Sequence, residues 1–189
     1  ERVLETFLAE KAATDDTREQ AQRCFKAGEL LEERLARPAE AAQLYGEALV
    51  LDPGLLSAGR ALERLLEKTG RFADLCTQLE RELSSTPEAG EKVALLFRVA
   101  RLREDRLGDL AGAAADYRKI LELDPTHILA LRSLAIVLER AGQTTELAVT
   151  LEHAASILKE SREAVALLTR AGEIREQAGD EAGAAAAWE

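Results

Sequence analysis

The sequence has 189 residues, 47% of them hydrophobic and 32% charged, which is the balance of a folded globular protein rather than a disordered one. Its net charge of −10 argues against a protein that coats nucleic acid or binds an anionic membrane surface, because both tasks need clustered lysine and arginine. Arginines interrupt its longest apolar runs, so we expect no membrane insertion. No targeting segment is visible; the compartment stays open, with the cytoplasm favoured.

The residues used most are Ala, Leu, Glu and Arg, all strong helix formers, while aromatic residues make up only 4%. This composition predicts an all-α fold. In chain order, the apolar spacing predicts helices at 1–11, 16–37, 39–51, 55–69, 72–84, 88–107, 110–123, 127–141, 144–157, 162–178 and 180–189.

Turn and capping residues punctuate this pattern. Gly70 suits the left-handed position after a helix end. The stretch 86–88, Thr-Pro-Glu, predicts an N-cap followed by a first-turn proline and a first-turn acid. Asp-Pro-Thr at 124–126 predicts a similar start, and Ser161 predicts the N-cap of the next helix.

The chain repeats itself with the offset that separates Pro53 from Pro125, which we call the repeat length. Residues 32–53 read EERLARPAEAAQLYGEALVLDP, and residues 104–125 read EDRLGDLAGAAADYRKILELDP. After a deletion of one residue, GDLAGAAADY at 108–117 matches GDEAGAAAAW at 179–188. The repeat covers nearly the whole chain, which is typical of stacked helical units.

Each repeat length divides at Pro87 into two units, a shorter one that follows Pro53 and a longer one that ends at Pro125. The lengths of the two units differ by about one helical turn. We expect a single repeat domain spanning 1–189. Its units are 16–53, 54–87, 88–125, 126–159 and 160–189, preceded by the remnant 1–15 of another unit.

Stacking explains the repeat, since one helical hairpin cannot bury both of its apolar faces and a neighbouring hairpin can cover the other. Small residues should lie where helices approach closely, and large aromatic residues should fill the gaps between helices. The small residues are Ala41, Ala42, Ala113 and Ala114, and the aromatic ones are Tyr45, Tyr117 and Trp188.

These residues resemble the tetratricopeptide repeat, a helix-turn-helix unit with small or apolar framework positions and a proline near its end. The strongest matches precede Pro53 and Pro125. They are Ala41, Tyr45 and Ala48 in one copy and Ala113 and Tyr117 in the other. The resemblance implies a right-handed α-solenoid with a concave groove lined by the first helix of each pair, and proteins or peptides as ligands. Helical repeats with longer units, such as the Sel1-like class, are the alternative.

No set of residues indicates catalysis or a metal or cofactor site. The histidines, His127 and His153, fall in a first and a second helix, and no His, Cys and Asp cluster has metal-ligand spacing. Cys24 and Cys76 fall within apolar helical patterns, which predicts buried thiols rather than a disulfide. We expect no catalytic residue, metal or cofactor.

A periodic set of cations is the candidate binding site. On the geometry that the resemblance implies, one or two cations of each unit face the groove, and their spacing alternates between the shorter and the longer unit length. They are Lys26, Arg60, Arg64, Arg98, Arg132 and Arg170. One hypothesis is a positive strip that binds an acidic or carboxylate-bearing segment. The other is a solvated surface of mixed charge, because Glu19, Glu67, Glu139 and Glu173 also fall on groove positions.

The resemblance also excludes one ligand class. Members of the family that bind chaperone tails use paired asparagines with lysines and arginine, and this sequence contains no Asn. A receptor for Hsp70 or Hsp90 tails is therefore not expected.

The sequence favours a non-catalytic scaffold that binds a protein or peptide in the concave groove. The alternative function is a regulatory or docking region of a multidomain enzyme whose catalytic part lies outside this chain. The chain starts without Met and ends within a helical pattern, so we expect it to be a piece of a longer protein. Its composition and unit style resemble those of bacterial repeat proteins. End-to-end self-association through uncapped solenoid ends is a further expectation.

Overall fold

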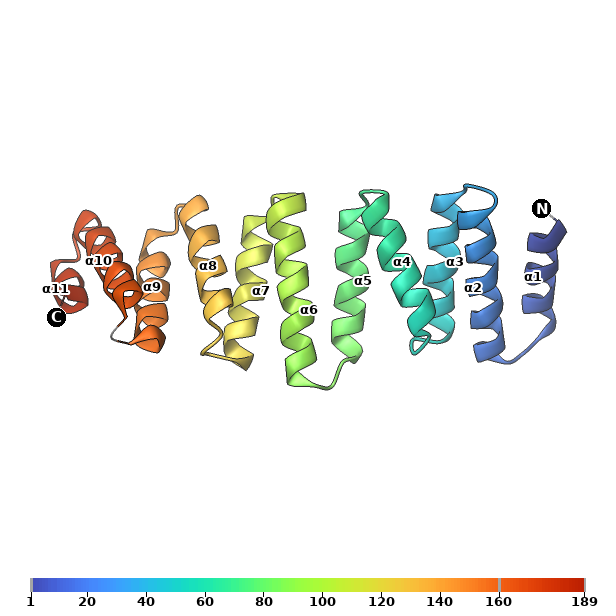
Figure 1. Ribbon diagram of the computed structural model, residues 1–189, viewed down its shortest axis with the longest axis horizontal. Coiled ribbons are helices and arrows are strands. Elements are labelled where there is room, and N and C mark those ends of the chain that lie inside the picture. The colour runs from blue at the N-terminus through green and yellow to red at the C-terminus, as the bar shows by residue number, and fades with distance from the viewer. Residues whose placement is uncertain (1, 160, 189) are drawn as a thin grey trace. The chain divides into compact units, whose positions relative to one another are not determined.

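A computed structural model describes residues 2–159 and 161–188, which form helices joined by short turns (Figure 1). No strand occurs among these residues. The helices are α1 (Arg2–Ala13), α2 (Thr17–Glu33), α3 (Pro38–Leu51), α4 (Leu56–Lys68), α5 (Phe72–Ser85), α6 (Ala89–Leu102), the π-helix η1 (Arg103–Leu107), α7 (Leu110–Leu123), α8 (Ile128–Arg140), α9 (Thr144–Leu158), α10 (Arg162–Gln177) and α11 (Glu181–Trp188).

Expected and observed helix boundaries agree within two residues, apart from the ends of α2 and α6. The helix expected at 16–37 stops at Glu33, because Ala36 adopts a left-handed backbone with φ 52° before Pro38 begins α3. The helix expected at 88–107 continues to Leu107, but its last turn is the π-helix η1. The all-α prediction is confirmed.

Two of the expected helix-capping assignments are wrong. Thr86 does not cap α6; its hydroxyl donates to the carbonyl of Glu82 at the end of the preceding helix. Asp124 ends α7, and its side chain accepts from Thr126, while the Nδ1 of His127 accepts from the amide of Ala130 to begin α8. In both places the residue belongs to the end of the helix before it. Ser161 is confirmed, since its hydroxyl accepts from the amide of Ala164.

The chain divides into two compact units, Glu1–Leu75 and Cys76–Glu189, with the boundary inside α5. The first unit contains α1 to α4 and the second contains α6 to α11. In each, neighbouring helices along the chain pack against each other. We call α2, α4, α6, α8 and α10 the first helices, and α3, α5, α7, α9 and α11 the second helices. The single domain over 1–189 stays a prediction.

Each unit has its own apolar core. The larger one lies in the second unit, where Leu134, Val137 and Leu138 of α8 pack among residues of α6, α7, α9 and α10. The first unit has a cluster around Ala21, Cys24, Ala48 and Ala58. The alanines expected at close helix contacts are confirmed as buried, and so are both cysteine thiols.

Tyr45 and Tyr117 are fully buried, as expected, and each ties a second helix to the helical segment before it. The hydroxyl of Tyr45 donates to Glu32 at 2.9 Å, and that of Tyr117 donates to Glu104 at 3.0 Å. Each ring also lies 5.7 Å, centroid to centroid, from a phenylalanine of the preceding first helix. The side chain of Trp188, the third expected gap-filler, lies outside the described residues.

Ala36 provides a test of the hairpin geometry, because the repeat places glycine at the equivalent positions: Gly108 has φ 67° and Gly179 has φ 77°. An L-residue in this region costs about 1–2 kcal/mol. Glycine recovers that cost but gains freedom in the unfolded chain worth about 0.4–1 kcal/mol. We therefore expect Ala36→Gly to raise the free energy of unfolding by about 0.5–1 kcal/mol, measured by urea denaturation.

The reverse change, Gly108→Ala, is the matched control. A Cβ at this position meets nothing within 4 Å, so only the backbone conformation resists it. We expect it to lower the free energy of unfolding by about 1 kcal/mol. A neutral or destabilising Ala36→Gly beside a destabilising Gly108→Ala would contradict the strain assigned to Ala36.

The buried tyrosines predict how stability falls at high pH. Burial and the negative charge of Glu104 raise the pKa of Tyr117 from 10.0 to about 12. The neutral phenol is therefore favoured in the folded state, and this contribution is complete below pH 10 and is lost as the pH rises through about 12. We expect tyrosinate absorbance to appear together with unfolding, and Tyr117→Phe to flatten the loss of stability in this window. Tyrosinate absorbance of Tyr117 that develops near pH 10.0 while the helical circular dichroism is intact would refute the assignment.

Candidate functional site

All six cations of the candidate site lie on first helices: Lys26 on α2, Arg60 and Arg64 on α4, Arg98 on α6, Arg132 on α8 and Arg170 on α10. Each of them is exposed. Their common placement follows from the repeat, which returns the same side of each first helix to solvent. Their role as binding residues stays a prediction.

Most of these cations form an ion pair with a carboxylate. Lys26 pairs with Glu29 on its own helix at 2.9 Å, and Arg64 reaches from α4 to Glu32 of α2 at 2.9 Å. In the second unit, Arg132 pairs with Glu163 and Arg170 pairs with Glu139. Arg98 also interacts with other residues. The guanidinium of Arg60 forms no hydrogen bond or ion pair within residues 2–159 and 161–188. In each unit, cations of the set therefore lie beside carboxylates.

The two pairs of the second unit tie α8 to α10 in opposite directions. Arg132 of α8 reaches Glu163, and Arg170 of α10 returns to Glu139, so each helix supplies one cation and one anion. All four side chains are roughly half exposed, with relative exposures of 45–55%. Pairs this exposed contribute about 0–1 kcal/mol each, so a partner's charged groups can replace them at small cost.

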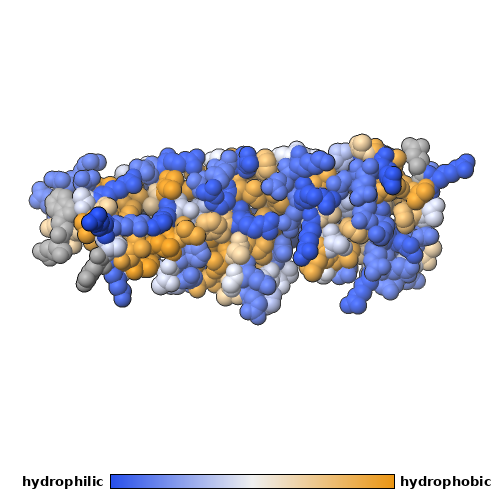
Figure 2. Space-filling model, viewed as in Figure 1, coloured by the Kyte–Doolittle hydropathy of each residue, from blue (hydrophilic) through white to orange (hydrophobic). Residues whose placement is uncertain are grey.

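Two large apolar side chains lie on the same side of α8 as these ion pairs. Leu129 is 55% exposed and Ile136 is 52% exposed. With Arg132 and Glu139 they follow the spacing 129, 132, 136 and 139, which places all four on one stripe of the helix. We call Leu129, Arg132, Ile136 and Glu139, with Glu163 and Arg170, the α8–α10 face. Figure 2 shows hydrophobic residues at the surface among hydrophilic ones.

Sequence reasoning missed Leu129 and Ile136, because α8 reads as apolar on nearly every side and its exposed stripe cannot be told from its core stripe. A signal was available in the repeat itself. The positions one repeat length earlier are Ser57 and Arg64, which are plainly polar. A position that is polar in one copy and apolar in the other is a poor candidate for the shared core.

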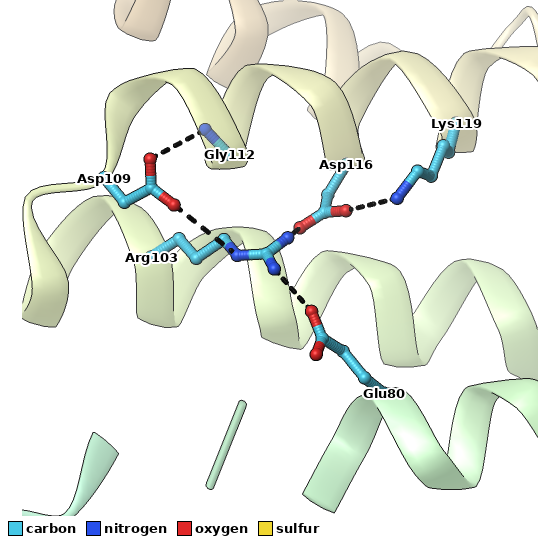
Figure 3. A network of polar contacts seen from close by, with 6 residues as sticks. All are labelled: Glu80, Arg103, Asp109, Gly112, Asp116 and Lys119. Atoms are coloured by element: carbon cyan, nitrogen blue, oxygen red, sulfur yellow. Dashed lines mark hydrogen bonds and ion pairs between the residues drawn. The ribbon is translucent and has the colours of Figure 1, made fainter. Parts of the chain in front are cut away.

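The densest polar network lies elsewhere, around Arg103 in η1 (Figure 3). Its guanidinium contacts Asp116 of α7 and Glu80 of α5, and lies 3.7 Å from Asp109, whose side chain accepts from the amide of Gly112 at the start of α7. Asp116 is only 2% exposed and also pairs with Lys119 at 3.0 Å. The network joins three helical segments.

The same arrangement recurs one repeat length later. Arg175 of α10 binds Glu152 of α9 at 2.6 Å and Asp180 at 2.7 Å, and Asp180 accepts from the amide of Gly183 to begin α11. Hydrogen bonds from Gly183 and Arg175 hold the pKa of Asp180 below its ordinary value. Because both copies place the arginine between two neighbouring second helices, we interpret it as a structural tie of the repeat.

A cleft of about 310 Å³ lies on the other side of α8. Leu131 and Leu134 of α8 face it from between α7 and α9, and the residues of these two helices that line it are Arg118, Leu121, Glu122, Glu146, Val149, Thr150 and His153. Arg118 forms two hydrogen bonds to Glu146 across it, at 2.6 and 2.7 Å. These hydrogen bonds hold the pKa of the Glu146 carboxyl below its ordinary value. No residue of this cleft was singled out from the sequence as a binding residue.

Among the described residues, no group of three or more His, Cys, Asp or Glu side chains could hold a metal ion. None of the helices that these residues form is both long and apolar enough to cross a membrane.

No protein-family model matches the chain, and no curated protein matches it in sequence. Solved structures do match its fold. YrrB, described as a TPR protein with an unusual peptide-binding site, is 15% identical with a TM-score of 0.50, over 97% of this chain and 89% of that one. MamA AMB-1 is 16% identical with a TM-score of 0.53, over 89% and 88%. A tetratricopeptide repeat protein from Parabacteroides merdae is 14% identical with a TM-score of 0.52, over 85% and 62%.

The chain therefore has the fold of tetratricopeptide repeat proteins, an α-solenoid of helix-turn-helix units, as the sequence predicted. At these identities the likeness establishes the fold alone. The ligand of this chain therefore has to be inferred from the chain's own surfaces.

The Arg103 network predicts a large loss of stability when its cation is removed. Arg103→Met leaves the buried carboxylate of Asp116 with only Lys119, so we expect the free energy of unfolding to fall by about 3 kcal/mol. Asp105→Asn removes an exposed partner of Arg101 and is the control, with an expected loss below about 0.5 kcal/mol. Urea denaturation measures both. Equal effects of the two variants would contradict the structural role.

Proposed function

We propose that this chain is a non-catalytic protein-binding scaffold, and that its α8–α10 face binds an extended segment of a partner protein. The observation that carries the proposal is the pair of large apolar side chains, Leu129 and Ile136, each more than half exposed between two cross-helix ion pairs. An apolar surface rimmed by charged groups is typical of an interaction site.

The chemistry of binding follows from this arrangement. Apolar side chains of the partner cover Leu129 and Ile136, and each Å² of apolar surface removed from water contributes about 25 cal/mol. The face lies on two helices held by the core, so little conformational freedom is lost on the receptor side when the partner binds.

The charged groups of the face would determine which charged residues the partner carries. An acidic residue of the partner could take the place of Glu163 or Glu139 and accept two hydrogen bonds from the freed guanidinium. Since Arg132 and Arg170 already hold carboxylates, an acidic partner exchanges one ion pair for another, and the net gain is small. The acidic partner expected from the sequence is therefore retained as a secondary feature, with apolar contact as the main source of affinity.

The non-catalytic part of the proposal rests on where the perturbed groups lie. The pKa values of Tyr45, Tyr117 and Arg103 are raised, and all three side chains lie in helix–helix contacts rather than in the cleft. Perturbed groups gather at catalytic sites because catalysis needs them there, but structural networks shift pKa values too. The pKa of Glu146, in the cleft, is lowered by its hydrogen bonds to Arg118, and the pKa shifts of Tyr45, Tyr117 and Arg103 accompany contacts between helices.

The test compares what three variants capture from a lysate of the source cell, with mass spectrometry as the readout. Leu129→Ser/Ile136→Ser removes the apolar pair, and we expect it to reduce capture of the specific partner about tenfold or more. Val165→Ser is the matched control, because Val165 is 62% exposed on α10 but lies on a different side of that helix from Glu163 and Arg170. It should capture the partner as the parent chain does.

The third variant, Arg132→Glu/Glu163→Arg, exchanges the two charges while keeping the pair. A partner held by apolar contact stays bound, whereas a partner whose carboxylate binds the guanidinium of Arg132 is lost. Partners retained in full by Leu129→Ser/Ile136→Ser, or lost equally with Val165→Ser, would show that this face is not the binding site. Circular dichroism confirms that each variant is folded.

A further inference from the structure

The cleft between α7 and α9 is separate from the α8–α10 face. Leu131 and Leu134, which form its floor, project from α8 on the side away from Leu129 and Ile136, since successive residues of a helix turn by about 100°. A site in this cleft therefore does not depend on the proposed function. Its volume of about 310 Å³ is at the lower end for ligand sites, which suits one side chain rather than a large molecule.

The two ends of the cleft differ in charge. At one end, Arg118 and Glu146 satisfy each other through two hydrogen bonds. At the other end, the exposed carboxylate of Glu122 and the half-buried ring of His153 form no hydrogen bond or ion pair with any described residue. With one cation and two carboxylates around it, the cleft has one negative charge without a partner.

We propose that this cleft binds a long cationic side chain, lysine or arginine, presented by a partner protein. The aliphatic stem lies on Leu121, Leu134 and Val149, and the charged head reaches Glu122 beside His153. Lysine and arginine characteristically bury their methylene groups on apolar surface while the charged end stays among polar groups. The net charge of −10 adds a general attraction for a basic partner.

The repeat supports a specific role for this cleft. Its apolar positions Leu121 and Leu134 match Leu49 and Leu62 in the preceding copy, as expected of residues that hold the helices together. Glu146 corresponds to the acidic Asp74, but four other positions around the cleft do not match. In the preceding copy, Arg118, Glu122, Leu131 and His153 correspond to Gly46, Val50, Gly59 and Arg81. The carboxylate of Glu122 and the ring of His153, which would contact the cation, are thus confined to the second copy.

The test uses three small probes that share a backbone: N-acetyl-lysine methylamide, N-acetyl-arginine methylamide, and N-acetyl-norleucine methylamide, which keeps the stem without the charge. Each is titrated into the isotope-labelled chain at pH 8 and low salt, and amide shifts are followed by NMR. We expect the two cationic probes to shift amides of 118–123 and 146–153 saturably, with norleucine binding more weakly. Added salt should weaken the cationic probes.

Single substitutions of opposite sign identify the charge. Glu122→Gln should weaken the lysine probe about three- to fivefold, the upper range for an exposed ion pair. Arg118→Gln leaves the carboxylate of Glu146 without its hydrogen-bond partner. This variant should therefore bind the lysine probe more strongly. Glu173→Gln removes the same charge from α10, outside the cleft, and should leave the affinity unchanged.

Two outcomes would overturn the proposal. Equal binding of norleucine and lysine would make the cleft an apolar slot without charge recognition. An unchanged affinity of Glu122→Gln for the lysine probe would show that Glu122 does not bind the cation. An equal loss of affinity in Glu173→Gln would show that only the net charge of the chain matters. Because Glu122 is exposed and forms no ion pair with described residues, its substitution should not unfold the chain.

Discussion

The burial of Tyr45 and Tyr117 is the interaction on which two of the helical hairpins depend, α2 with α3 and α6–η1 with α7. Each ring fills the space between a first and a second helix, and each hydroxyl is satisfied by a glutamate of the preceding helical segment. A phenol buried without a partner would cost free energy, so the ring and the carboxylate have to occur together. Gly28 shows how close the packing is, since a Cβ there would lie 2.6 Å from a ring carbon of Tyr45. The hairpin so formed still has an uncovered apolar face, and stacking follows from that need.

Most of the fold could be predicted from the sequence because the sequence contains the same repeat twice. The repeat length and the alternation of shorter and longer units give the helices, their order and the buried alanines. The errors occurred where a local rule competed with a neighbour. Thr86 is a good N-cap by type, yet its hydroxyl bonds to the helix before it. Ala36 is a good helix former, yet it takes the left-handed position that glycine occupies in the other copies. Neither choice can be read from residue type, because both depend on where the adjacent helix ends.

The candidate site was less predictable than the fold, for a physical reason. The geometry implied by the resemblance predicted that the six cations face the groove, but it could not assign their partners. The pairs Arg132–Glu163 and Arg170–Glu139 join residues far apart in the sequence, a separation fixed by stacking and not by the spacing of one helix. A single sequence gives the charge of each residue, whereas the net character of a surface depends on which opposite charges lie within reach across helices. The exposure of Leu129 and Ile136 could not be predicted for a similar reason, because it depends on which side of α8 the core occupies.

The two copies of the repeat separate positions that hold the stack from positions free to change. Leu49 and Leu62 recur as Leu121 and Leu134, and Tyr45 recurs as Tyr117, because every unit has to bury the same faces. The outer stripe of α8 and the rim of the α7–α9 cleft do not recur, so the stack does not require them. A helix in the middle of such a stack can therefore carry two different surfaces at once. Its core residues fix its position, and the sides left exposed can differ from unit to unit without loss of the fold. In this chain α8 carries apolar groups between ion pairs on one side and the floor of a charged cleft on the other.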